Sequence, residues 1–163
     1  MAKVRLRPVT PEDEAFLYEV YKTTRAEEMA MVPWDEAQRE AFLKMQFSAQ
    51  QAHYRTYYSG TSHDIILSGT DMVGRLYVAR ERDAIRILDI TILPEHRNKG
   101  LGTPLIKDLM AEAARARLPL TIHVESFNPS YRLFERLGFS KVKDDGFYQL
   151  MEWKSKDEGG RMK

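Results

Sequence analysis

The fold is decided by the stretch IRILDITILPEHRNKGLG, residues 85–102. Residues 85–93 are apolar at nearly every position, which is typical of a central strand covered on both faces. After Gly100 and Gly102, apolar residues repeat at helical spacing from Leu105 to Ala113. The stretch therefore predicts a strand, a tight glycine-containing loop and an amphipathic helix.

This loop suits a phosphate group. Glycines let the backbone turn tightly and approach a ligand, and the helix that follows offers unpaired N–H groups and the positive end of its dipole. Two familiar alternatives are excluded. A P-loop needs Lys and Ser/Thr directly after its second glycine, and no lysine follows Gly102. A dinucleotide-binding loop needs a third glycine at position 105, which is Leu105.

Arg97, Gly100 and Gly102, placed after this strand, resemble the acetyl-CoA motif of the GNAT N-acetyltransferase superfamily. A second signature, NPSYRLFERLGF at residues 128–139, resembles the next motif of that superfamily and lies in the expected order. The chain is thus similar to GNAT enzymes over most of its length. The resemblance is specific for the superfamily and says nothing about the acceptor.

The resemblance implies an α/β (α+β) fold. Its mixed sheet would have about six to seven strands, with helices on both faces and splayed central parallel strands. It implies acetyl-CoA as acyl donor, with the pantetheine arm in the gap beside the backbone of Ile92 and Leu93. Backbone donors near the end of that strand would polarise the thioester carbonyl. The residues that would hold the pyrophosphate are Arg97, Asn98, Lys99, Gly100, Leu101, Gly102 and Thr103. Asn128 is a pantetheine ligand, a helix N-cap, or both.

Periodicity and turn residues outline the rest of the chain. We expect a helix from Pro11 to about Thr23, an apolar loop at Met29–Trp34, and a second helix, capped by Asp35 and Gln38, that runs to about Tyr54. A third follows from Pro129 to Leu137, with Gly138 as its stop. The expected strands are Lys3–Arg7, His63–Leu67, Met72–Arg80, Leu120–Glu125, Phe139–Val142 and Phe147–Trp153. The Leu120–Glu125 strand should lie parallel to the 85–93 strand.

Asp89 is the first candidate for a general base, because a carboxylate inside an apolar strand is costly unless it is paired. The alternative is a buried ion pair with an arginine such as Arg86. Glu125 is the second candidate, and its alternative is a solvated or ion-paired surface position. The chain has no cysteine, which argues against a covalent route and favours direct attack of the amine.

The position that often carries the general acid in this superfamily differs in this sequence. GNAT enzymes often carry a tyrosine three residues before the leucine that corresponds to Leu137, and this sequence has Phe134 there. Phenylalanine cannot donate a proton, so the role is vacant, filled by water, or taken by Tyr131 one turn earlier. The leading prediction is an N-acetyltransferase. A CoA-binding regulatory module without turnover, or a transferase of longer acyl groups, stays open.

Composition limits the other classes. With 163 residues, 43% of them hydrophobic, the chain fits one domain, predicted over 1–153 with a charged tail at 154–163. A net charge of +1 gives no drive toward nucleic acid or an anionic membrane. The four histidines show no metal-ligand spacing, and no metal is expected. Without an apolar leader or a spanning run, we expect a cytoplasmic protein acting on a small-molecule or peptide amine. A homodimer is left open.

Overall fold

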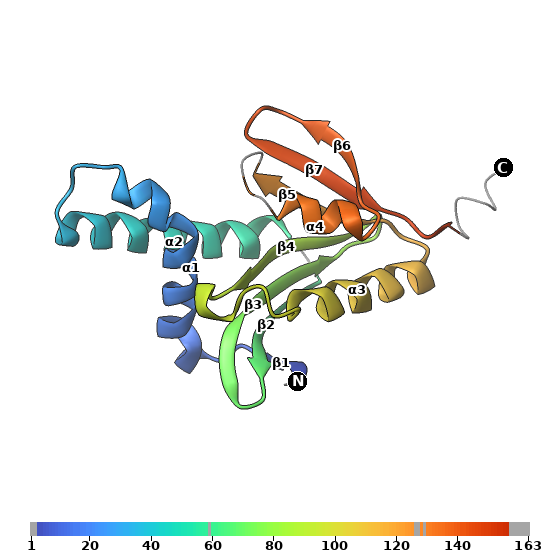
Figure 1. The fold of residues 1–163 in the computed structure, drawn as a ribbon, viewed down its shortest axis with the longest axis horizontal. Coiled ribbons are helices and arrows are strands. Elements are labelled where there is room, and N and C mark those ends of the chain that lie inside the picture. Colours follow the sequence, from blue (N-terminus) through green and yellow to red (C-terminus); the bar gives the residue numbers. More distant parts are fainter. Residues whose placement is uncertain (1–2, 59, 126–127, 129, 157–163) are drawn as a thin grey trace.

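The computed structural model describes residues 3–58, 60–125, 128 and 130–156. These residues form one seven-stranded mixed sheet with helices on both faces (Figure 1), in the strand order β1-β2-β3-β4-β5-β7-β6. The strands are β1 (Val4–Pro8), β2 (Thr61–Ser68), β3 (Asp71–Arg80), β4 (Ile85–Ile92), β5 (Leu120–Glu125), β6 (Ser140–Asp144) and β7 (Tyr148–Trp153). The helices are α1 (Glu14–Ala30), α2 (Glu36–Tyr57), α3 (Gly102–Ala116) and α4 (Tyr131–Arg136), with short 3-10 helices η1 (Pro11–Asp13) and η2 (Pro94–His96).

The β4–β5 pair divides the sheet. It is the parallel pair that the strand-helix-strand rule predicts, and every other neighbouring pair is antiparallel. The pairing covers only Ile85 to Ile87 against Leu120 to Ile122. Beyond these residues the strands part, and Figure 1 shows β5, β7 and β6 leaning away from β1–β4. The predicted splaying of the central strands is confirmed.

Two apolar cores lie on opposite faces of the sheet. β2 shows how alternation divides them, because Ile66 packs with α3 and α4 while Ile65 and Leu67 pack with α1 and α2. The larger core also takes the apolar faces of β3, β4 and β5. Covering both faces explains why β4 reads as a nearly continuous apolar run. The predicted fold class is therefore confirmed.

Two helix ends form as the sequence predicts. Asp35 Oδ1 accepts the Gln38 N–H at 2.8 Å, and Gln38 Oε1 accepts the Asp35 N–H at 2.9 Å, which completes the capping box of α2. At the end of α4, Gly138 has a φ of 103°. There the Phe139 N–H bonds back to the Phe134 carbonyl at 2.9 Å, as in a Schellman motif.

Two helix boundaries were predicted wrongly. α1 continues past Thr23 to Ala30, because the Thr23 and Thr24 hydroxyls donate to carbonyls three residues earlier and fit within the helix. Part of the expected apolar loop is therefore helical. α4 begins at Tyr131, and its N-cap is Ser130 instead of Asn128. The predicted start at Pro129 lies outside the described residues.

The outermost strands of the sheet are β1 and β6. All five residues of β6 are exposed. Most of the predicted charged tail at 154–163 lies outside the described residues. Within the described part of the chain, no helix combines the length and the apolar character that crossing a bilayer requires.

Candidate active site

The loop between β4 and α3 has a backbone that suits a phosphate ligand. Gly100 and Asn98 have φ of 74° and 62°, a left-handed conformation that glycine and, less readily, asparagine adopt. Arg97 folds back, and its Nε donates to the Ile92 carbonyl at 2.8 Å. This bond uses a backbone group of one of the two residues expected to face the pantetheine arm. Residues 97–100 are all exposed.

The first turn of α3 is open to an anion. Its N-cap, Leu101, makes no side-chain capping bond, and the turn contains no acidic residue. Among the described residues, no heavy atom lies within 4 Å of a Cβ placed on Gly102, so the space beside Gly102 is open. The first-turn amides and the positive end of a 15-residue helix lie next to this space. The residues present fit a pyrophosphate group.

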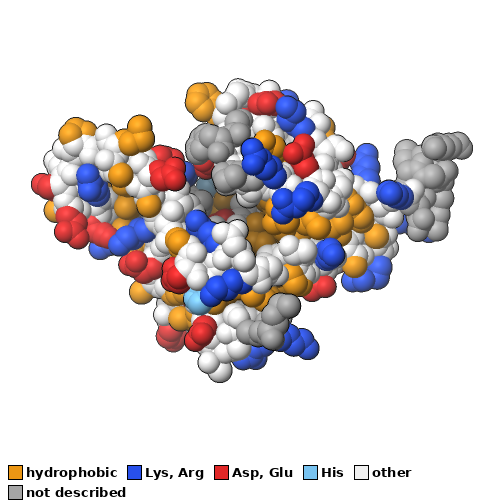
Figure 2. All heavy atoms as spheres, viewed as in Figure 1, with side chains coloured by type: hydrophobic (Ala, Val, Ile, Leu, Met, Phe, Trp, Pro, Cys, Tyr) orange, Lys and Arg blue, Asp and Glu red, His pale blue; other side chains and the backbone are white. Residues whose placement is uncertain are grey.

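The surface around this helix agrees with that interpretation. Figure 2 shows an apolar band over the region between the β6–β7 hairpin and α3, bordered by Lys and Arg side chains. Positive charge at this border favours an anionic ligand.

The edge of β4 that faces β5 is the second element of the site. Its register with β5 ends at Ile87, so the following residues carry backbone groups with no partner in that strand. Ile92 and Leu93, at the end of this edge, are half-buried. An extended arm could add to the edge as a strand would, through main-chain hydrogen bonds.

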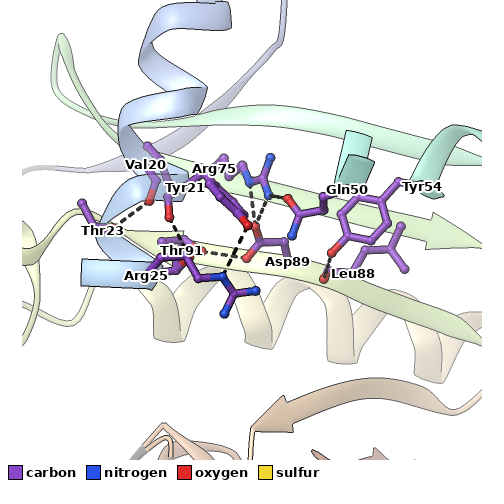
Figure 3. Close-up of polar contacts among 11 residues, drawn as sticks. Val20, Tyr21, Thr23, Arg25, Gln50, Tyr54, Arg75, Leu88, Asp89 and Thr91 are labelled. Carbon is purple, nitrogen blue, oxygen red and sulfur yellow. Dashed lines mark hydrogen bonds and ion pairs between the residues drawn. The ribbon is translucent and has the colours of Figure 1, made fainter. Parts of the chain in front are cut away.

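Asp89 lies on the opposite face of β4, toward α1 and α2, and is ion-paired (Figure 3). Its Oδ2 accepts from Arg75 Nε at 2.6 Å, and its Oδ1 accepts from the Thr91 hydroxyl at 2.7 Å. Asp89 therefore forms an ion pair, as the alternative prediction stated. Its partner is Arg75, and the partner suggested from sequence, Arg86, is wrong. Arg86 pairs with Glu81 and Asp83 instead.

Sequence reasoning missed Arg75 and Gln50, and it interpreted Tyr54 as part of an aromatic cluster that lines a substrate entrance or packs half-buried at the helix end. Arg75 is completely buried, and its Nη2 donates to Gln50 Oε1 on α2 at 2.6 Å. One turn later, the Tyr54 hydroxyl donates to the Leu88 carbonyl at 3.1 Å. A signal for Arg75 was present, because it interrupts the apolar strand β3 as Asp89 interrupts β4. Opposite charges inside two adjacent apolar strands indicate a pair.

Glu125, the second candidate base, ends β5 and is also ion-paired. Its carboxylate lies 3.5 Å from Arg25 of α1, and 27% of its side chain is exposed. Arg25 also contacts Glu28 at 3.2 Å and the Tyr21 hydroxyl at 3.4 Å. This bridge joins α1 to β5 where β5 no longer pairs with β4.

The second motif forms the turn into α4. Asn128 Oδ1 accepts the Ser130 N–H at 2.9 Å, so its side chain shapes the turn that precedes the helix. Phe134 is 2% exposed, and its ring packs edge-on against Phe139 at 5.2 Å in the larger core. Tyr131, the candidate acid, is half-buried at the edge of the same core. Among the described residues, no three His, Asp or Glu side chains are grouped to hold a metal ion.

Comparison with known protein families identifies the family of this chain. The sequence model of the acetyltransferase (GNAT) domain matches residues 3–140. No curated protein sequence matches the chain significantly.

Several solved structures share the fold of this chain. One is the PaiA N-acetyltransferase from Thermoplasma acidophilum in complex with coenzyme A, with a TM-score of 0.68 and 18% identity over 94% of this chain and 99% of that one. An acetyltransferase from Thermus thermophilus has a TM-score of 0.68 and 20% identity over 95% and 100%. The spermidine/spermine N-acetyltransferase SpeG from Vibrio cholerae, in mutant forms, has a TM-score of 0.61 and 16% identity over 98% of each chain. Since the matched family domain spans most of the sequence, the chain belongs to the GNAT acetyltransferase family.

Proposed function

We propose that the protein transfers the acetyl group of acetyl-CoA to a primary amine of a small molecule, amino acid or peptide by direct attack in a ternary complex. The observation that carries this proposal is the separation of β4 from β5 next to the uncapped start of α3. Together they offer a free strand edge for the pantetheine arm and amide donors for the pyrophosphate.

In this proposal the chain itself binds and orients the donor. Arg97, Lys99 and the amides of residues 98–103 hold the pyrophosphate, while the backbone of Ile92 and Leu93 lies along the arm. Asn128 contributes either directly or by fixing the turn before α4. When bound, acetyl-CoA supplies an activated acyl thioester.

The acceptor amine must be neutral to attack. For a lysine-like amine with a pKa near 10.4, only about one molecule in 2,500 is neutral at pH 7, equivalent to about 4.6 kcal/mol. For an α-amine with a pKa near 8, forming the neutral amine at pH 7 costs only about 1.4 kcal/mol. We propose Asp89 as the base, with Glu125 as second candidate, and Tyr131 as the acid. Asp89 and Glu125 already have arginine partners, which makes each a weaker base. This favours an α-amine acceptor, because its deprotonation costs less.

One observation favours a second function. Phe134 occupies the position where a tyrosine is common in the family, and it is packed inside the core. A protein that binds CoA and lacks turnover, acting as a regulatory module, would need no proton donor there.

Calorimetric titration with CoA, followed by acetyl-CoA consumption assays with an amine panel, separates the two functions. The panel should contain spermidine, free amino acids and a peptide with an unblocked N-terminus; spermidine is included because SpeG has a similar fold. Binding with transfer to any amine supports the transferase. Binding without transfer to any of them supports the regulatory module. No detectable CoA binding would contradict both.

We further propose that residues 1–153 form a single N-acetyltransferase domain and that 154–163 form a charged tail. The family match over 3–140 and the end of β7 at Trp153 support this boundary.

A further inference from the structure

The β4 strand contains a β-bulge where it leaves β5. In the β3–β4 register, Tyr77 is opposite Asp89 and Val78 is opposite Ile87, so Leu88 is an extra residue on β4. Ile87 is also the last residue of β4 that pairs with β5. A bulge leaves its extra residue out of the ladder and changes the direction of nearby backbone groups, and it commonly lies beside an active site.

The carbonyl of the extra residue has a side-chain partner. The Tyr54 hydroxyl donates to the Leu88 carbonyl at 3.1 Å, across from α2 (Figure 3). The Tyr54 ring is held edge-on against Tyr77 at 5.0 Å, and Tyr77 is the cross-strand partner of Asp89. Burial, followed by the nearby Asp89 charge, raises the pKa of Tyr54, so the hydroxyl keeps its proton and stays a donor.

The residue after the bulge is tied to the same helix. Asp89 pairs with the fully buried Arg75, whose Nη2 donates to Gln50 Oε1 at 2.6 Å. Gln50 and Tyr54 are four residues apart, so they lie on one face of α2. This face of α2 thus holds the Leu88 carbonyl directly, through Tyr54, and the Asp89 side chain indirectly, through Gln50 and Arg75.

The hydrogen bond to the Leu88 carbonyl also fixes the neighbouring backbone. The Leu88 C=O and the Asp89 N–H belong to one planar peptide unit, so a bond to the first sets the direction of the second and of the backbone that follows. The GNAT resemblance implies that backbone donors near the end of β4 polarise the thioester carbonyl, and the bulge sets the course of the strand that leads to them. Such donors are effective only when they are preorganised.

We propose that Tyr54 is a positioning residue that sets the bulge of β4 and, through it, the amide donors for the thioester carbonyl. The proposal rests on the proposed function, since it assumes that acetyl-CoA binds along β4. Tyr54 is given no contact with the reacting atoms.

The test is Tyr54→Phe, with Tyr57→Phe as the matched control. Tyr57 lies on the same helix, is 69% exposed, and loses the same hydroxyl in the variant. For Tyr54→Phe we expect kcat to fall about two- to tenfold, the effect of one lost hydrogen bond, with the KM for acetyl-CoA within about twofold. The fall should be the same at every pH, because a positioning residue does not titrate during turnover.

A second readout separates positioning from loss of folded protein. The infrared carbonyl stretch of bound acetyl-CoA, labelled with 13C at the carbonyl, reports only on ligand held by folded protein. We expect it to move toward the frequency of free acetyl-CoA in Tyr54→Phe and to stay at the wild-type frequency in Tyr57→Phe.

An unchanged carbonyl frequency in Tyr54→Phe, or an equal shift in the control, overturns the proposal. A kcat loss that disappears on the alkaline side of the pH profile also overturns it, since a proton donor contributes only while it is protonated. Wild-type protein that fails to bind acetyl-CoA would instead contradict the proposed function, and this inference with it.

Discussion

The two faces of β4 are built in different ways. On the face toward α3, the loop at residues 97–102 offers backbone amides and an uncapped helix start. On the face toward α1 and α2, side chains from α2, β3 and β4 form a network around the buried Arg75. The coenzyme side is thus encoded in one short segment, whereas the other side is assembled from segments far apart in the sequence. Variants on each face should fail in different ways.

The largest effect should come from breaking the side-chain network. Asp89→Asn removes the countercharge of Arg75, which is completely buried. Breaking a buried pair costs about 3–5 kcal/mol, and the 19% exposure of the Asp89 side chain puts our expectation at about 3 kcal/mol. Urea unfolding followed by circular dichroism measures this loss.

The double variant Arg75→Met/Asp89→Leu is the control for charge. Replacing both partners by apolar residues is often neutral, so we expect most of the stability to return. If Asp89 is the base, the acetylation rate stays low in the recovered protein. Wild-type activity in a stable double variant would remove Asp89 from the proposed chemistry.

On the coenzyme face, Gly102→Val should weaken CoA binding and leave the fold intact. The added side chain points into space that no described residue fills, and we expect it to block the first-turn amides. Losing two charge-assisted hydrogen bonds lowers affinity about 100-fold, measurable by calorimetry.

Ala111→Val introduces the same β-branched residue at an exposed position of α3, away from its start. It should bind CoA as the wild type does. Undiminished affinity in Gly102→Val would show that the loop does not hold the pyrophosphate.

A smaller effect is expected from His63, which belongs to the side-chain face. Burial and the Arg75 charge lower the pKa of His63 to about 4, from an ordinary value of 6.5. Between these values the unfolded chain binds a proton that the folded chain does not. Stability is therefore complete above about pH 6.5 and declines as the pH falls toward 4. Between pH 7 and pH 5 we expect His63 to lower the free energy of unfolding by about 1 kcal/mol, because its side chain is partly exposed.

His63→Phe keeps a flat ring against Tyr77, on which His63 stacks at 4.2 Å, and cannot titrate. Its free energy of unfolding should change less between pH 7 and 5 than that of the wild type. Equal slopes in the two proteins would assign the acid sensitivity to other groups.

The smallest effect should be at Arg25, which joins α1 to β5. Its ion pairs with Glu28 and Glu125 are long and partly exposed, so Arg25→Gln should cost less than about 1 kcal/mol. Arg25→Lys keeps the charge and serves as the control in thermal melts. A loss of several kcal/mol would mean that this bridge, and not the β4–β5 register alone, holds the two halves of the sheet together.

The sequence predicted what local rules determine. The strand and helix around Gly100 and Gly102 follow from apolar periodicity, and the α2 capping box follows from Asp35 and Gln38. The parallel β4–β5 pair follows from the handedness of the connection. The separation of β4 from β5 could be predicted only from the family resemblance, because no spacing rule states where two strands stop pairing.

The contacts of the α1–α2 face could not be predicted in this way. Arg75 and Gln50 are 25 positions apart, and Tyr54 and Leu88 are 34 positions apart. The second contact lies at the β4 bulge, which shifts the register by one residue and carries no glycine or proline signal. The same limit explains why Arg86, closer in sequence to Asp89, was the wrong partner.

The two outer strands of the open sheet have a consequence for behaviour in concentrated solution. Arg5, Arg7 and Pro8 lie on β1, and Lys141 and Lys143 lie on β6. Positive charge and proline on unpaired edges discourage strand-to-strand association between molecules. Arg7 and Lys141 pair with Asp13 and Asp144 of the same molecule, so Arg5 and Lys143 supply the positive charge that opposes edge-to-edge association of two copies. The sheet has this protection without being closed into a barrel.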